Sequence, residues 1–133
     1  MNKAELIELP KFLDDRGNLS FIEEDNHIPF EVRRVYWIYD VPGGEQRGGH
    51  AFKQTEELIV ALSGSFDVVL NDGFEEHRFH LNRSYYGVLV PKMFWRMLEN
   101  FSTNSLALII ASTEFNNEDY IRDLNQFKKL KAQ

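Results

Sequence analysis

The residues best suited to chemistry lie in the stretch 47–53, which reads Arg-Gly-Gly-His-Ala-Phe-Lys. Its glycines let a backbone and a ligand approach each other closely. His50 can accept or donate a proton near neutral pH, which makes it the first candidate for acid–base catalysis. An apolar run over 58–62 and a Ser-Gly turn follow, so we expect a small β-barrel to present His50 at the mouth of its cavity. The alternative is a turn histidine that is bonded to a nearby carbonyl.

A cluster of cations accompanies this histidine, since Arg33, Arg34, Arg47 and Lys53 fall within 21 residues. The chain as a whole is acidic, with a net charge of −6, which disfavours a polynucleotide held by a broad basic surface. A local group of arginines can still bind a phosphate. Neighbours on a strand point to opposite faces, so Arg33 and Arg34 cannot both face one cavity, and we favour Arg34 because it shares a face with Tyr36. We therefore expect an anionic small molecule as the ligand.

Aromatic residues near these cations have two possible roles. Tyr36 could relay a proton from the cavity wall, or it could fill the core. The triplet 94–96, Phe-Trp-Arg, could contact a ligand or pack inside the barrel. Which role applies depends on the face of the strand that each side chain occupies.

The length of 133 residues suits one domain, so we treat 1–133 as a single unit. Hydrophobic residues make up 43% of the chain, which favours a packed globular core over disorder. The sequence has no cysteine, which excludes disulfides and thiolate catalysis and is typical of a reducing compartment. No apolar stretch of about 18 residues occurs, so we expect neither a signal peptide nor a membrane span, and the cytoplasm is the predicted location.

Short runs of β-forming residues, separated by turn signals, dominate the chain. The clearest hairpin joins 66–70 to 78–81 through the Asn-Asp-Gly turn at 71–73, because these residues tolerate a positive φ. Only the C-terminus has helical spacing, from Glu118 to Leu130. The pattern predicts an all-β sandwich or barrel with a short C-terminal helix. The predicted strands are 18–23, 32–39, 58–62, 66–70, 78–81, 85–91 and 105–111.

The stretch around His50 resembles the signature of the cupins, in which histidines and a glutamate bind a metal. Here Phe52 stands where the second histidine belongs, and a phenyl ring cannot ligate. In the second cupin motif Arg96 falls near the histidine position, where a cation would repel a metal. His50 with Glu56 or Glu57 would then supply too few ligands, so we expect neither a metal nor another cofactor.

Segments spread over most of the chain resemble the sugar 3,4-ketoisomerase cupins. The resemblance implies a metal-free, cupin-type jelly roll and a homodimer, often with exchanged N-terminal strands. It also implies an enzyme that acts on TDP-4-keto-6-deoxy-glucose and moves the ketone from C4 to C3, in the synthesis of 3-amino-3,6-dideoxy sugars. The segments that carry the resemblance are 16–19, 28–30, 34–36, 47–51, 62–70, 81–83, 100–102 and 119–123.

One position departs from this family. The family pattern Arg-Gly-x-His-Ala-His-Lys becomes Arg-Gly-Gly-His-Ala-Phe-Lys here, so one of two acid–base histidines is absent. Two interpretations stay open, a 3,4-ketoisomerase or a non-catalytic cupin that binds a nucleotide sugar or another saccharide. For the enzyme we expect catalysis by His50 and Tyr36, with Tyr36 shuttling the hydroxyl proton in place of the missing histidine. The resemblance places Arg16 and Arg96 beside the sugar. The predicted substrate-binding residues are Arg16, Arg34, Arg47, Phe52, Lys53 and Arg96.

Overall fold

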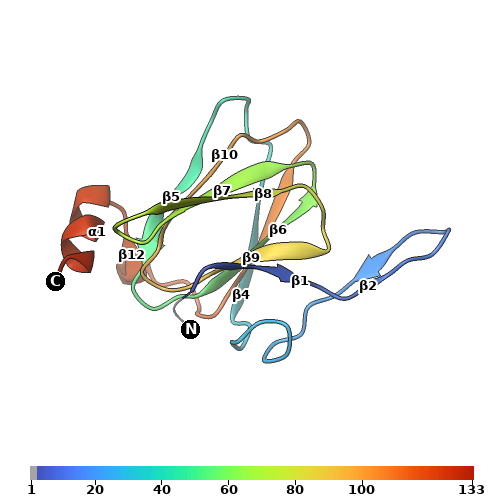
Figure 1. Cartoon of the computed structure of the whole chain (residues 1–133), viewed down its shortest axis with the longest axis horizontal. Helices are drawn as coiled ribbons and strands as arrows, with labels where there is room; N and C mark the ends of the chain where they lie inside the picture. Colours follow the sequence, from blue (N-terminus) through green and yellow to red (C-terminus); the bar gives the residue numbers. More distant parts are fainter. Residues whose placement is uncertain (1–2) are drawn as a thin grey trace.

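Two antiparallel sheets of five strands each face one another in the computed structural model, which describes residues 3–133 (Figure 1). The first sheet has the order β1-β9-β6-β11-β4 and the second the order β12-β5-β10-β7-β8. Most neighbouring strands are distant in the chain, which is the arrangement of a jelly roll, so the predicted fold class is confirmed. The strands are β1 (Glu5–Glu8), β2 (Lys11–Phe12), β3 (Leu19–Ser20), β4 (Arg34–Tyr39), β5 (Arg47–Phe52), β6 (Glu57–Ser63), β7 (Phe66–Asn71), β8 (Glu76–Leu81), β9 (Tyr86–Val90), β10 (Trp95–Glu99), β11 (Leu106–Ala111) and β12 (Tyr120–Ile121).

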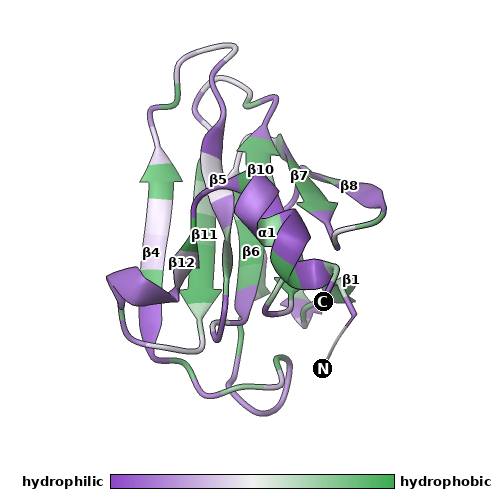
Figure 2. Ribbon diagram, turned by 90° about the vertical axis from the view of Figure 1, so that its left-hand side faces the viewer, coloured by the Kyte–Doolittle hydropathy of each residue, from purple (hydrophilic) through white to green (hydrophobic). Residues whose placement is uncertain are grey.

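The core lies between the two sheets, because alternate residues of each strand point inward. On β4, Arg34, Tyr36 and Ile38 are partly buried, whereas Trp37 and Tyr39 are exposed on the outer face. Arg34 therefore shares a face with Tyr36, as predicted. Figure 2 shows that β6 and β11 are mainly hydrophobic along their length. Core residues from the two sheets include Ile59, Ala61, Phe66, Val68, Leu70, Val88, Leu98 and Ile109.

The N-terminal region differs from the predicted strand at 18–23. Only Leu19–Ser20 is a strand here, and it pairs with β2 in a hairpin that extends away from the two large sheets (Figure 1). The chain then turns back, and Ile28 and Phe30 pack on the outer face of the first sheet against Leu58. This segment is therefore ordered by side-chain packing and not by strand pairing. The alternation of inward and outward residues along a strand could not indicate such packing.

Five strands, β1, β2, β5, β10 and β12, were not among the predictions. β5 contains Gly48 and Gly49, and glycine weakens the intrinsic preference for a strand. Pairing with β10 on one side and β12 on the other orders it. The predicted hairpin of β7 and β8 is confirmed, with the Asn71 side chain accepting a hydrogen bond from the Gly73 N–H in the turn.

The C-terminal helix begins later than predicted. Asn116 caps a short 3-10 helix, η1 (Asn117–Asp119), after which β12 pairs with β5. The α-helix α1 (Leu124–Lys131) starts only after Asp123, whose carboxylate accepts hydrogen bonds from two backbone N–H groups of the first turn. No helix within residues 3–133 is long and apolar enough to cross a membrane.

Candidate active site

The site lies at the end of the barrel where β5 meets β12. His50 and Phe52 are on β5, and Arg96 on β10 is paired in register with His50. Tyr36 on β4 and Glu57 on β6 come from the opposite sheet, and their hydrogen bonds to Arg96 bridge the two sheets. The sheet topology thus brings together residues that are far apart in the sequence.

A closed hydrogen-bond network joins three of these side chains. Arg96 donates from Nε to Glu57 Oε1 at 2.6 Å and from Nη2 to the Tyr36 hydroxyl at 2.7 Å. The Tyr36 hydroxyl in turn donates to the other oxygen of Glu57. The side chains of Arg96 and Glu57 are each only 1% exposed, so this is a buried ion pair with a phenol bound to both partners.

Gly48 allows the guanidinium to occupy this position. Its φ is +75°, in the left-handed region, and an added Cβ would lie 2.5 Å from Arg96 Nη1. The same Nη1 donates to the Gly48 carbonyl at 3.3 Å. The close approach expected from the glycines is therefore observed, and the partner is an arginine of the protein's own chain.

The electrostatics of the site keep each group in a defined protonation state. Burial, the largest cause, acts together with the charges of Arg96, Arg122 and Arg34 to lower the pKa of His50 from 6.5 to about 3. His50 is thus a neutral base at physiological pH. Burial raises the pKa of Tyr36, so its hydroxyl keeps its proton. Burial opposes the charge of Arg96, but the Glu57 carboxylate outweighs it and raises the pKa of the guanidinium.

Two buried nitrogens have no hydrogen-bond partner among the described residues. These are His50 Nε2 and Arg34 Nε. Unpaired buried polar atoms are rare in folded proteins and need a partner such as water or a ligand. A base and a cation on opposite sheets are therefore available to a bound molecule.

Aromatic rings line the same space. The ring of Tyr120 lies 4.8 Å from that of His50 and 4.7 Å from that of Phe52, centroid to centroid. The guanidinium carbon of Arg34 is 5.4 Å from the Tyr36 ring and 6.0 Å from the Phe52 ring. Tyr120 was missed in the sequence analysis because it was assigned to the helix, whereas it belongs to β12.

The structure brings together five of the predicted site residues and separates the other three. His50, Tyr36, Arg34, Phe52 and Arg96 lie together between the two sheets, as the contacts above show. The remaining three lie elsewhere: Arg47 is exposed at the start of β5, Lys53 is exposed just beyond the end of β5, and Arg16 lies on the projecting hairpin with its side chain 91% exposed.

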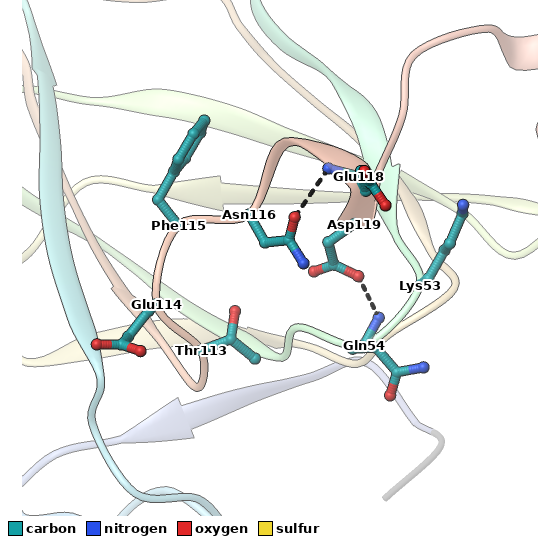
Figure 3. Close-up of a pocket in the computed structure, with 8 residues that line it drawn as sticks. All are labelled: Lys53, Gln54, Thr113, Glu114, Phe115, Asn116, Glu118 and Asp119. Carbon is teal, nitrogen blue, oxygen red and sulfur yellow. Dashed lines mark hydrogen bonds between the residues drawn. The ribbon is translucent and has the colours of Figure 1, made fainter.

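Lys53 lines a neighbouring hollow of about 560 Å³ (Figure 3). The hollow adjoins the site through Phe115, whose ring centroid is 5.8 Å from that of Tyr120 and 5.7 Å from the Arg34 guanidinium carbon. Three carboxylates in its lining disfavour a phosphate there. The lining residues are Lys53, Gln54, Thr113, Glu114, Phe115, Asn116, Glu118 and Asp119.

Metal-ligating side chains do not gather at the site. Within residues 3–133, no group of three His, Cys, Asp or Glu residues is placed to hold a metal ion. Glu57, which the sequence analysis considered as a ligand, is instead bonded to Arg96 and Tyr36. The absence of a metal from the working protein remains a prediction.

The two facing sheets define a cupin-type protein whose interior holds a neutral histidine, a tyrosine and a buried ion pair. A family model described as FdtA, WxcM-like, C-terminal, matches residues 2–132, and the chain belongs to this family. A curated TDP-4-oxo-6-deoxy-alpha-D-glucose-3,4-oxoisomerase of Aneurinibacillus thermoaerophilus is 39% identical over 124 residues, which cover 93% of this chain and 89% of the relative.

Solved structures agree with this assignment. A 3,4-ketoisomerase from Helicobacter canadensis is 34% identical and covers 100% of both chains, with a TM-score of 0.95. The sugar 3,4-ketoisomerase QdtA from Thermoanaerobacterium thermosaccharolyticum, in complex with TDP, is 29% identical, with a TM-score of 0.94 over 97% of this chain and 94% of that chain. The resemblance to the sugar 3,4-ketoisomerase cupins is confirmed.

Proposed function

We propose that this chain is a 3,4-ketoisomerase acting on TDP-4-keto-6-deoxy-glucose. The observation that carries the proposal is a buried neutral imidazole, with Nε2 free, beside the Arg96–Tyr36–Glu57 network. The named relatives, which are isomerases of such sugars, support the same conclusion. They do not favour the non-catalytic alternative that the Phe52 departure raised.

The reaction moves a ketone between adjacent carbons without net oxidation. The C4 carbonyl acidifies the hydrogen at C3, and His50 Nε2 removes it to give an enediolate. His50 then returns a proton at C4, while Tyr36 carries the hydroxyl proton from O3 towards O4. Arg34 is the cation with a free buried donor, so it is placed to stabilise the developing oxyanion. Arg47, which was predicted as a substrate-binding cation, is exposed.

Deuterium exchange tests the function directly. The protein is incubated with TDP-4-keto-6-deoxy-glucose in deuterium oxide, and proton NMR follows the C3 hydrogen and the appearance of the 3-keto sugar. We expect loss of the C3 signal together with product formation. An unchanged C3 signal at high enzyme concentration and long times would refute the isomerase.

Arg34 is expected to bind the diphosphate or the adjacent sugar oxyanion. Charge-assisted hydrogen bonds contribute on the order of 1.5–3 kcal/mol, so Arg34→Ala should weaken TDP binding roughly tenfold or more in calorimetry. Arg33→Ala is the matched control, because Arg33 points outward and forms an exposed ion pair with Glu31 at 3.4 Å. We expect it to change the affinity by less than about twofold. Equal losses in the two variants would remove Arg34 from the site.

We also propose a homodimer in which the β2–β3 hairpin reaches the partner subunit. Within one protomer the hairpin extends away from the sheets, and Arg16 on it is bonded to Asp14 rather than to a site residue (Figure 1). Arg16 can border the sugar only if a second copy receives the hairpin. Large apolar side chains exposed on the hairpin are Phe12 (60%), Leu13 (72%) and Leu19 (57%).

Light scattering should give a mass of about 31 kDa, twice the chain mass of 15.6 kDa. The double substitution Leu13→Asp/Leu19→Asp should shift the protein towards the monomer, because it places charges in the apolar interface. Phe74→Asp is the control, since Phe74 is 77% exposed at the tip of the β7–β8 hairpin. A wild-type mass equal to one chain would contradict the dimer.

We further propose that the protein acts in the cytoplasm without metal or cofactor. Elemental analysis of the purified protein tests for a bound metal.

A further inference from the structure

Glu57 is a fully buried carboxylate of the site, and the reaction as described above gives it no part. It lies on the inward face of β6 with its side chain 1% exposed. One carboxylate oxygen accepts from Arg96 Nε at 2.6 Å, and the other accepts from the Tyr36 hydroxyl. A purely structural ion pair would need only the first of these contacts.

The hydrogen bonds of the Tyr36 hydroxyl decide in which direction it can pass a proton. Its oxygen accepts a hydrogen bond from Arg96 Nη2, and its proton points at Glu57. Burial and the nearby carboxylate disfavour the phenolate, and a neutral phenol oxygen does not hold a second proton, so Tyr36 by itself can store neither a deficit nor an excess of protons. A proton that reaches the phenol oxygen from a sugar hydroxyl must therefore be matched by a proton that leaves towards Glu57.

We propose that Glu57 is the proton acceptor of the hydroxyl relay, acting through Tyr36 in place of the missing imidazole; this inference rests on the isomerase function proposed above. The O3–H bond of the enediolate breaks as its proton passes to the Tyr36 oxygen, while the Tyr36 proton passes to Glu57 Oε2. The reverse transfer, from Glu57 through Tyr36, forms the O4–H bond and restores the carboxylate. Each oxygen keeps its electron pair, and no proton is gained or lost overall.

Arg96 favours the return of this proton. Its guanidinium stabilises the ionised form of Glu57, so the proton that Glu57 accepts is held only briefly and passes back through Tyr36 to O4. The guanidinium is held by three hydrogen bonds, to Glu57, Tyr36 and the Gly48 carbonyl, so it need not reorganise as the charge moves. Phe52, which replaces the histidine of the family pattern, can take no part in proton transfer.

Glu57→Gln separates the relay from the carbon chemistry. Removal of the C3 hydrogen by His50 does not use the relay, so C3 deuterium exchange should stay within about tenfold of wild type. Formation of the 3-keto sugar should fall by roughly 10²-fold or more, the usual contribution of a general acid–base group. The affinity for TDP should change by less than about threefold, because Glu57 does not bind the nucleotide.

Asp67→Asn is the matched control. Asp67 is also a largely buried carboxylate paired with an arginine, Arg78, at 2.7 Å, but it lies on β7 away from the cavity network. It should leave both exchange and product formation unchanged. Equal loss of exchange and product formation in Glu57→Gln would overturn the inference and make Glu57 a structural residue.

Glu57→Asp keeps the test decisive if Glu57→Gln does not fold, because it keeps a carboxylate beside Arg96 but shortens the side chain that reaches the Tyr36 hydroxyl. It should show the same split, with exchange retained and product formation lost. Full product formation in this variant, or equal loss of exchange and product formation, would likewise overturn the relay. Wild-type protein that shows neither exchange nor product would instead refute the proposed function itself, so the two failures are distinguishable.

Discussion

His50→Asn should abolish both C3 deuterium exchange and product formation, with a loss of roughly 10³-fold or more. Asparagine keeps a polar side chain of similar reach but cannot accept a carbon-bound proton. The affinity for TDP should change by less than about threefold, because the nucleotide is held mainly by cations. This variant therefore loses both C3 exchange and product formation, whereas Glu57→Gln should lose only product formation.

The pH profile provides a second measurement of the same residue. Because burial and the nearby arginines lower the pKa of His50 to about 3, the base is already free at pH 5 to 8. The acid limb of kcat/KM that belongs to His50 should lie well below pH 6.5, the ordinary pKa of histidine.

His80→Asn is the control for the His50→Asn substitution, since the His80 side chain is 53% exposed and bonded to Asp67 outside the site. Unchanged exchange in His50→Asn would exclude His50 as the base.

Arg96→Met should lower the free energy of unfolding by about 3–5 kcal/mol, the usual consequence of removing one partner of a buried ion pair. The cause is Glu57, whose carboxylate would remain buried without a compensating charge. Tyr36 would still donate one hydrogen bond to it, but a single phenol cannot replace the guanidinium. Urea unfolding followed by tryptophan fluorescence measures the change.

Two further variants test whether the loss of stability in Arg96→Met comes from the uncompensated charge of Glu57. The double substitution Arg96→Met/Glu57→Gln should recover part of the stability, because it removes the isolated carboxylate. Arg78→Met should cost much less than Arg96→Met, since the Arg78 side chain is 48% exposed and its partner Asp67 keeps other hydrogen bonds. Equal losses for Arg96→Met and Arg78→Met would contradict a special cost of burial at Arg96.

Local features of the sequence were enough to predict several parts of the molecule. Strand alternation has a period of two residues, so the shared face of Arg34 and Tyr36 follows from their spacing alone. The turn at 71–73 follows from its residue types in the same way. His50 and Phe52 were identified because the 47–53 pattern is contiguous and matches a known family. Each of these predictions depends on residues that are close together in the chain.

Only the tertiary structure decided how distant segments combine. Tyr120 enters the site because it pairs with Phe52 on β5, although its helical spacing suggested a place in the C-terminal helix. The Glu57–Arg96 contact joins residues 39 positions apart, and neither residue type alone indicates its partner. Arg47 and Arg34 were indistinguishable as cations in the sequence, and strand register placed only Arg34 inside. Strand pairing over long sequence separations depends on the packing of the whole sheet, which no local pattern contains.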